Sequence, residues 1–409
     1  MVRRPLRRYV LAATFALTGC SALLDVKDIY FDPNASPTNP EGGADGDPTT
    51  EGGSTDGGTD SATCVADTMT DPLHCGRCGH SCLGGACAAG VCQAVELAAV
   101  TDAPMRHVAV SDQHIFMSTT IALTTQVGGL WRVPKAGGVA ELYSTIRYSE
   151  AMVVLGDKLY FVVDDNPVNG TDAFGGFYSC PLTGPAPCTP TLIAASTNSR
   201  SITIDKGKVL YGDDTTGKGL MTYTPGGAAP TLFRDGYGFS ANSFVDGTVA
   251  FYTATIYANP QRAKVFEILP DAEVIERYAY ENPNANDGRL IGDTNSLLFT
   301  AYDYTATAGG VVRRIPRTGG APCDLGGSTN KRPYGIYADN ARVYWSNQGD
   351  GPSQPYTNGS VVSCEQAGCC TTPQVMWTGN GQPEGVTGDA DAIYFVTSSK
   401  GSIWKVAKP

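Results

Sequence analysis

The stretch that decides the fold is Ile336-Tyr-Ala-Asp-Asn-Ala-Arg-Val-Tyr344, which recurs as Val386-Thr-Gly-Asp-Ala-Asp-Ala-Ile-Tyr394. Each copy has a short apolar strand, a turn rich in Asp, Asn and Gly, and an apolar-aromatic strand, the pattern of a β-hairpin. Repeats spaced roughly 40 to 50 residues apart indicate a repeat architecture. Five earlier copies begin at Val108, Met152, Ile202, Asn242 and Leu290.

A second hairpin follows each copy, as in Gly129-Leu-Trp-Arg-Val-Pro134 leading to Val139–Tyr143. Four strands per repeat are typical of a β-propeller blade. The seventh copy ends at Gly401–Val406 without its fourth strand, and Ala94–Ala98 has the sequence of that strand. We therefore predict an all-β, seven-bladed propeller over residues 94–409, closed by N- and C-terminal strands in one blade. A count of six or eight blades is the alternative.

The repeat resembles the broad superfamily of NHL, YWTD and TolB-like propellers over residues 94–409. The resemblance is one of shape and carries no function-specific motif. Propellers host many functions, so the fold does not identify the activity.

The N-terminus has the pattern of an export signal, with four arginines before an apolar run from Tyr9 to Leu17 that is too short to span a bilayer. Leu17-Thr18-Gly19-Cys20 resembles the bacterial lipobox, which implies a signal peptide over residues 1–19 and lipidation of Cys20. Ser21 after the cysteine implies, by the same resemblance, the outer membrane rather than the inner one, on its periplasmic side or at the cell surface. An ordinary signal peptide with a chance cysteine is the alternative.

Residues 20–62 are acidic and rich in Gly, Pro and Thr, with almost nothing to bury, so we predict a disordered tether. The whole chain has a formal net charge of −11, which argues against nucleic acid as a partner. We expect a monomer held at the membrane by its lipid, with an envelope protein or glycan as partner.

Residues 63–93 form a cysteine-rich module with Asp71-Pro-Leu-His-Cys-Gly-Arg-Cys-Gly-His-Ser-Cys82 at its centre. This resembles a D-P-x-x-C-G-x-C-G-x-x-C module of exported Gram-negative proteins. Structural disulfides are expected, because so short a segment cannot build a core and exported cysteines usually pair. The alternatives are zinc bound with His74 and His80, or a redox pair of Cys75 and Cys78. The module's six cysteines are Cys64, Cys75, Cys78, Cys82, Cys87 and Cys92.

Six further cysteines lie in the predicted propeller. Cys180 and Cys188 flank one hairpin turn, and Cys364 flanks another with Cys369 or Cys370. Cys323 is left to pair with Cys369 or Cys370, or across blades.

Two columns of the repeat alignment are candidate ligand sites, because both fall at one mouth of the central channel. The first could grip a polar ligand, or its charges could neutralise one another as ion pairs. The second has carboxylates that suit Ca²⁺, or that form acidic solvated turns. The first column contains Arg106, Glu150, Arg200, Ser240, Gly288, Tyr334 and Glu384. The second contains Asp164, Asp165, Asp213, Asp214, Asp303 and Asp350.

Catalysis has little support in the sequence. The chain has four histidines, and no Gly-x-Ser-x-Gly, His-Glu-x-x-His or P-loop motif occurs. We therefore favour a non-enzymatic binding or scaffold lipoprotein whose propeller face recognises protein, glycan or peptidoglycan, with no cofactor apart from the candidate Ca²⁺. The alternatives are a metal-dependent propeller hydrolase or lyase that uses the acidic loops, and a structural role in envelope assembly.

Overall fold

The computed structural model describes residues 67–101, 104–119, 128–146, 149–164, 175–196, 199–213, 219–235, 242–256, 262–271, 273–281, 285–293, 295–303, 309–317, 320–351 and 356–409. The expected signal peptide, Cys20 and tether lie outside these residues. Every described residue belongs to one compact unit, which spans residues 40–409. Among the described residues, no helix has the length and apolar character needed to cross a membrane.

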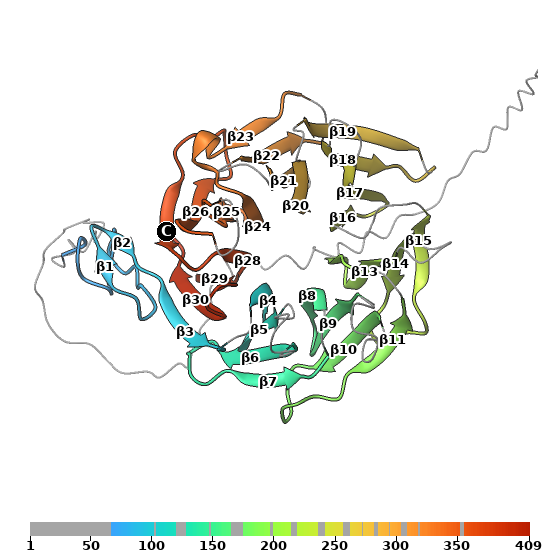
Figure 1. Cartoon of the computed structure of the whole chain (residues 1–409), viewed down its shortest axis with the longest axis horizontal. Coiled ribbons are helices and arrows are strands. Elements are labelled where there is room, and N and C mark those ends of the chain that lie inside the picture. Colours follow the sequence, from blue (N-terminus) through green and yellow to red (C-terminus); the bar gives the residue numbers. More distant parts are fainter. Residues whose placement is uncertain are drawn as a thin grey trace, which may run out of the picture. The chain divides into compact units, whose positions relative to one another are not determined.

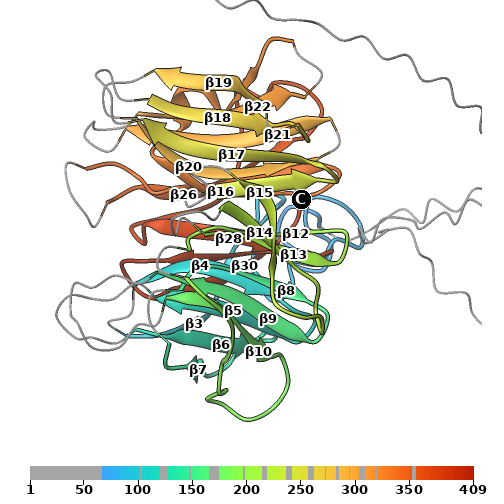
Figure 2. The ribbon, with the colours of Figure 1, turned by 90° about the vertical axis from the view of Figure 1, so that its right-hand side faces the viewer.

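Seven four-stranded antiparallel sheets surround a central channel, which confirms the predicted seven-bladed propeller (Figure 1). Within each blade the first strand lies nearest the channel, as the axial view of Figure 1 shows, and Figure 2 shows the same strands from the side. Blades 1 to 3 consist of β4 (Met105–Val110), β5 (His114–Thr119), β6 (Leu130–Pro134) and β7 (Glu141–Ser144); β8 (Ser149–Leu155), β9 (Lys158–Val163), β10 (Gly176–Pro181) and β11 (Thr191–Ala195); and β12 (Ile202–Asp205), β13 (Lys208–Gly212), β14 (Gly219–Tyr223) and β15 (Thr231–Asp235).

The remaining blades follow in chain order, and blade 6 is preceded by a short 3-10 turn, η2 (Gly327–Thr329). Blades 4 to 6 consist of β16 (Asn242–Asp246), β17 (Val249–Ile256), β18 (Arg262–Ile268) and β19 (Val274–Glu281); β20 (Ala285–Gly292), β21 (Ser296–Asp303), β22 (Gly310–Pro316) and β23 (Cys323–Leu325); and β24 (Pro333–Ala338), β25 (Arg342–Asn347), β26 (Gly359–Glu365) and β27 (Gln374–Gly379).

Blade 7 closes the ring with strands from both ends of the propeller. It contains β28 (Pro383–Gly388), β29 (Ala392–Thr397) and β30 (Ser402–Ala407), and its fourth strand is β3 (Val95–Ala99). β3 pairs antiparallel with β30, with Val95 opposite Lys405 and Ala99 opposite Ser402. The strand missing from the last repeat is therefore the one that the sequence placed at residues 94–98.

Each joint between neighbouring blades has its own apolar core. Side chains alternate along a strand, so a sheet between two others buries both of its faces. In β9, Phe161 packs toward blade 1, whereas the adjacent Tyr160 packs toward blade 3. The closing joint is built in the same way, with Ile115 and Met117 of blade 1 against Ile403 of blade 7.

Polar contacts reinforce several joints at the hairpin turns between first and second strands. Lys135 of blade 1 pairs with Asp389 of blade 7, and Lys408 Nζ lies 2.7 Å from Asp339 Oδ2 of blade 6. Arg317 of blade 5 contacts Asp246 of blade 4 in the same way, at 2.6 Å. The aspartates of the repeated turns thus help to fix each blade to the next.

The cysteine-rich module carries disulfides Cys75–Cys87 and Cys82–Cys92, and Cys78 is also disulfide-bonded. Its short hairpin pairs β1 (Cys87–Ala88) with β2 (Val91–Cys92). The module contacts the propeller at Ala407, and the His80 ring nitrogens lie 2.6 Å from Cys75 O and 2.7 Å from Lys408 O. Cys64 lies outside the described residues.

The propeller cysteines form three disulfides. Cys180 pairs with Cys188 and Cys364 with Cys370, each within one blade. Cys323 of β23 pairs with Cys369 in the turn after β26, so this bond joins blades 5 and 6. These are among the pairings that the spacing left open.

Candidate functional site

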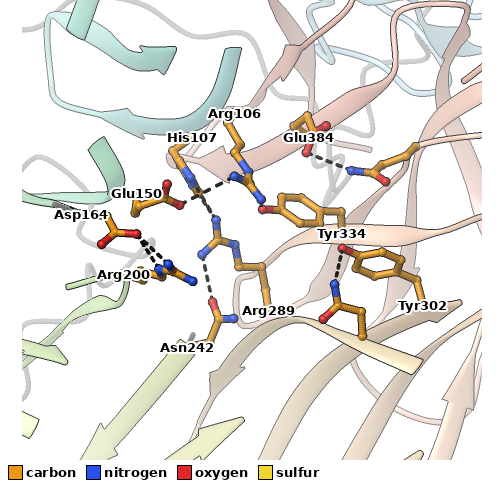
Figure 3. A network of polar contacts seen from close by, with 12 residues as sticks. Arg106, His107, Glu150, Asp164, Arg200, Asn242, Arg289, Tyr302, Tyr334 and Glu384 are labelled. Carbon is orange, nitrogen blue, oxygen red and sulfur yellow. Dashed lines mark hydrogen bonds and ion pairs between the residues drawn. The ribbon is translucent and has the colours of Figure 1, made fainter. Parts of the chain in front are cut away.

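The innermost strands carry irregular pairing at the positions of the first predicted column. In five blades, the ladder between first and second strands shifts register close to where the first strand begins. A β-bulge leaves residues out of the ladder and redirects their side chains. The residues at these shifts include Arg106, Glu150, Tyr334 and Glu384, which the bulges turn toward one mouth of the channel (Figure 3).

Arg106 reaches across this mouth from blade 1. Its Nε donates a 2.9 Å hydrogen bond to the Tyr334 hydroxyl of blade 6, and its Nη1 lies 3.7 Å from Glu150 Oε2 of blade 2. Tyr302 stands edge-on to Tyr334, with ring centroids 6.3 Å apart, and accepts a 3.1 Å hydrogen bond from Asn286 Nδ2. Burial raises the pKa of Tyr302, so its hydroxyl stays protonated at neutral pH.

Arg289 reaches across the channel from blade 5. Its Nη1 donates to Asn242 Oδ1 at 2.9 Å, and its Nη2 lies 2.5 Å from His107 Nδ1. Its guanidinium also lies over the Tyr334 ring, 5.3 Å from the centroid. Burial, and then the charges of Arg289 and Arg106, lower the pKa of His107 well below its usual value. His107 is therefore neutral, and its Nδ1 accepts the hydrogen bond from the arginine.

Glu384 is a buried carboxylate on β28. Its Oε2 accepts a 3.0 Å hydrogen bond from Gln348 Nε2, and its Oε1 accepts a 2.9 Å bond from Gln382 Nε2. Burial raises its pKa, although Arg106 and the two amides act in the opposite direction. The carboxylate is thus held in one orientation by two uncharged donors.

Arg200 and Asp164 form the most direct ion pair at this mouth. Arg200 Nη2 and Nε lie 2.7 and 2.8 Å from Asp164 Oδ2, which joins blade 3 to blade 2. Together with the residues above, they form what we call the mouth network, to which all seven blades contribute. Its members are Arg106, His107, Glu150, Asp164, Arg200, Asn242, Arg289, Tyr302, Tyr334 and Glu384.

A cavity of about 180 Å³, the channel cavity, lies among the inner strands beside the mouth network. Its polar lining includes His107, Arg289, Ser201 and Ser243. Glycines allow the inner strands to pack closely around it, because a Cβ at Gly385 would lie 2.7 Å from Arg106 O. One residue from each blade, at the first position of each sequence repeat, also lines the cavity: Val108, Met152, Ile202, Asn242, Leu290, Ile336 and Val386.

The structure brings Arg106, Glu150, Arg200, Tyr334 and Glu384 of the first predicted column together at one mouth. Ser240 lies outside the described residues. Sequence reasoning took Gly288 from blade 5 and missed Arg289. The irregular pairing between Asp287 and Leu290 leaves both residues out of the ladder with β21. Sequence reasoning also missed His107 and Asn242, although Asn242 is the one polar residue among the repeats' first positions.

The described aspartates of the second column have separate surroundings, and of these Asp164 belongs to the mouth network through Arg200. Asp213 is buried and accepts a 2.6 Å hydrogen bond from Ser196 Oγ, Asp303 is also buried, and Asp350 Oδ1 lies 3.7 Å from Lys331 Nζ. Asp165 and Asp214 lie outside the described residues. Within the described part of the chain, the one group of three potential metal ligands is formed by Cys75, Cys82 and Cys92, and all three are in disulfides.

Comparison with known proteins identifies the fold. No family model matches the sequence, and no curated protein matches it. Virginiamycin B lyase from Staphylococcus aureus is similar in structure, with a TM-score of 0.53 and 12% identity over 78% of this chain and 99% of that chain. A catalytically inactive variant of that lyase with quinupristin gives a TM-score of 0.54 at 12% identity, with the same coverage of both chains. The β-propeller domain of the Trilobed protease from Pyrococcus furiosus gives 0.50 at 10% identity, over 74% of this chain and 95% of that chain. At these identities the likeness establishes the propeller fold alone.

Proposed function

We propose that the protein is a lipid-anchored envelope protein whose propeller mouth binds an envelope protein or glycan, including peptidoglycan. One observation carries the proposal: the mouth network takes at least one side chain from every blade and gathers them beside one cavity. Arginine and tyrosine are among the residue types that are enriched in the hot spots of protein–protein interfaces. Their contacts with one another fix their positions before a ligand arrives, which lowers the entropic cost of binding.

Binding is favoured over a hydrolase or lyase reaction by the contacts of the two titratable groups His107 and Glu384. His107 is neutral and its Nδ1 faces Arg289, while Glu384 is occupied by two amide donors. In this arrangement His107 Nδ1 and both Glu384 oxygens already accept hydrogen bonds from neighbouring side chains, which fits groups that position a binding surface. The metal-dependent alternative has a direct test, since metal analysis of the purified protein that finds one stoichiometric divalent ion would favour an enzyme.

The location at the envelope rests on the first part of the sequence. The lipobox-like Leu17–Cys20 and the acidic tether that follows are what a membrane anchor with a displayed domain requires. We expect the Cys20→Ala variant to appear in the soluble fraction, because it would lack the acylated thiol. Continued sedimentation of this variant with washed membranes would contradict the anchor.

The binding function is tested with the full mature chain as bait against an envelope extract of the source bacterium. Tyr334→Ala removes the ring that Arg106 and Arg289 both contact, and should abolish capture of a specific partner. Arg277→Gln is the control, because Arg277 pairs with Glu267 on the outer strands of blade 4 and should not affect capture. A partner captured equally by wild type and Tyr334→Ala would refute recognition at this mouth.

A further inference from the structure

The lining of the channel cavity is partly polar and partly apolar. Six of the seven residues at the repeats' first positions are apolar, and blade 4 has Asn242 in their place. Asn242 is the residue whose amide oxygen accepts the hydrogen bond from Arg289. The change from an apolar to an amide side chain in this blade therefore places a hydrogen-bond acceptor for the Arg289 guanidinium in a column of residues that is otherwise apolar.

Arg289 differs from the other arginines of the mouth network in its partners. Arg106 lies near Glu150 and Arg200 is paired with Asp164, whereas the contacts of Arg289 among the described residues are to Asn242, neutral His107 and the Tyr334 ring. A guanidinium has five N–H donors, and these contacts use two of them. A half-buried cation with neutral partners is costly, and an anion beside it would lower that cost.

We propose that the channel cavity binds a small organic carboxylate, with the carboxylate at Arg289 and a short apolar chain against the aliphatic side chains of the inner strands. This inference goes beyond the proposed function, because it assigns a small-molecule ligand to the cavity beside the same mouth. Planar guanidinium and carboxylate groups form paired hydrogen bonds. The cavity is ample for such a ligand, because about 10–15 Å³ on the same measure suffices for one water molecule.

The lining favours a monoanion with an apolar chain over phosphate. One guanidinium with neutral neighbours balances a single negative charge, whereas a phosphate dianion would call for further cationic donors. The side chains of Ile336, Val386 and Met152 have no hydrogen-bond donor for a phosphate, but they would bury the methylene groups of a carboxylic acid. Affinity should therefore depend on both the charge and the chain length of the ligand.

The test is isothermal titration of the full mature protein with acetate, butyrate and hexanoate, and with hexanamide and inorganic phosphate as comparison ligands. We expect affinity to rise about fourfold per methylene from acetate to hexanoate. Hexanamide should bind at least about tenfold more weakly than hexanoate, because it cannot make a charge-assisted pair. Phosphate binding more tightly than hexanoate, or hexanamide binding as tightly as hexanoate, would overturn the assignment, as would the absence of saturable binding by any carboxylate.

Variants locate the site. Arg289→Gln should weaken hexanoate binding at least about tenfold, and Arg289→Lys, which keeps the charge, should lie between Gln and wild type. Arg277→Gln on β19 is the matched control and should bind as wild type. Equal affinities for wild type and Arg289→Gln, with matching melting temperatures, would show that the carboxylate does not use this residue.

The two proposals can fail separately. Partner capture that survives in Arg289→Gln, without carboxylate binding in the wild type, would refute the ligand class and retain the mouth as a recognition surface. Saturable hexanoate binding that is lost in Arg289→Gln, without any captured partner, would support the carboxylate site and refute an envelope macromolecule as its partner.

Discussion

Replacing Asp389 with Asn should weaken the joint that closes the ring. Asp389 lies in the turn between β28 and β29, where its Oδ1 accepts hydrogen bonds from the backbone N–H groups of Asp391 at 3.0 Å and Ala392 at 2.9 Å. Its Oδ2 accepts a 2.9 Å bond from the Tyr394 hydroxyl and pairs with Lys135 of blade 1. The carboxylate therefore connects the last blade to the first.

The magnitude follows from the charge that is lost. Asparagine keeps the oxygen for the backbone donors but puts an amide where Lys135 and Tyr394 donate. A hydrogen bond to a charged group contributes about 1.5–3 kcal/mol and a neutral one about 1 kcal/mol, so we expect a loss of about 2–3 kcal/mol. With an unfolding entropy of about 2.1 cal/mol/K per residue over roughly 300 residues, that loss lowers the melting temperature by about 3–5 °C.

The effect should depend on pH with a definite sign. Burial acts to raise the pKa of Asp389, but the bonds from Lys135, the turn backbone and Tyr394 outweigh it and lower the pKa below the ordinary 3.8. A lowered pKa means that the stabilisation is complete above that ordinary value and is lost as pH falls through the folded-state pKa. Calorimetry should therefore find a large difference between wild type and Asp389→Asn at pH 7 that shrinks in acid. A difference of equal size at pH 7 and about pH 2.5 would refute the ion-pair account.

Asp339→Asn is the matched control for the closing role. Asp339 has the same turn and a similar set of contacts, with Lys408 Nζ at 2.7 Å and the Tyr344 hydroxyl at 3.3 Å, but the chain itself continues from blade 6 to blade 7. Both variants should melt earlier, whereas faster amide exchange in β4 and β28 should appear in Asp389→Asn alone. Equal exchange in the two variants would show that the closing joint is no more dependent on this pair than an interior joint.

Three further variants test the mouth and the module. Glu384→Gln should gain stability relative to wild type as pH rises above 4.5, because burial raises the pKa of Glu384 and charging it costs the folded state; denaturant titrations from pH 4 to 8 would contradict this by showing the reverse trend. Gly385→Ala should lose about 1–3 kcal/mol, since its Cβ would lie 2.7 Å from the Arg106 carbonyl oxygen and backbone must move; an unchanged melting temperature would contradict the close approach. His80→Phe should speed proteolysis of the cysteine-rich module and leave the propeller's melting temperature nearly unchanged, because it removes the contacts to Cys75 O and Lys408 O; an unaltered cleavage rate would show that His80 does not hold the module in place.

The fold could be predicted because its apolar strands and its turn residues recur at a regular spacing in the sequence. A strand sandwiched between two sheets must be apolar on both faces, so each blade's second strand has an apolar-aromatic run such as Tyr344–Trp345, and this run recurs once per blade. Turns must recur at the same places, which gives the repeated aspartates. The last repeat lacks its fourth strand, and a strand-like segment near residue 95 precedes the first repeat. Pairing the two completes the seventh blade, and β3 does pair with β30.

The mouth could be predicted only in part, because it depends on departures from the repeat. Alignment placed Arg106 and Tyr334 in one column, but it treated the blades as identical and took Gly288 rather than Arg289 from blade 5. The irregular pairing between Asp287 and Leu290 has no signature in hydrophobic periodicity. The partner of Cys323 could not be fixed from the sequence for a related reason. A disulfide between blades, such as Cys323–Cys369, depends on the distance across a joint rather than on the spacing within one hairpin. A usable signal did exist: Asn242 interrupts an apolar column, and an amide on the channel wall requires a polar partner.

Closure of the ring and the geometry of the mouth network depend on the same strand, β4. Arg289 of blade 5 contacts His107 of blade 1, and Arg106 of blade 1 contacts Tyr334 of blade 6, so these bonds cross the channel rather than run around it. If the closing blade separated from blade 1, β4 would be released on one side, and both cross-channel contacts depend on residues of β4. Any change that opens the closing joint must therefore also disorganise the mouth network. Conversely, a ligand that holds Arg289 against His107 would stabilise the closed ring, because it binds the closed state and not the open one.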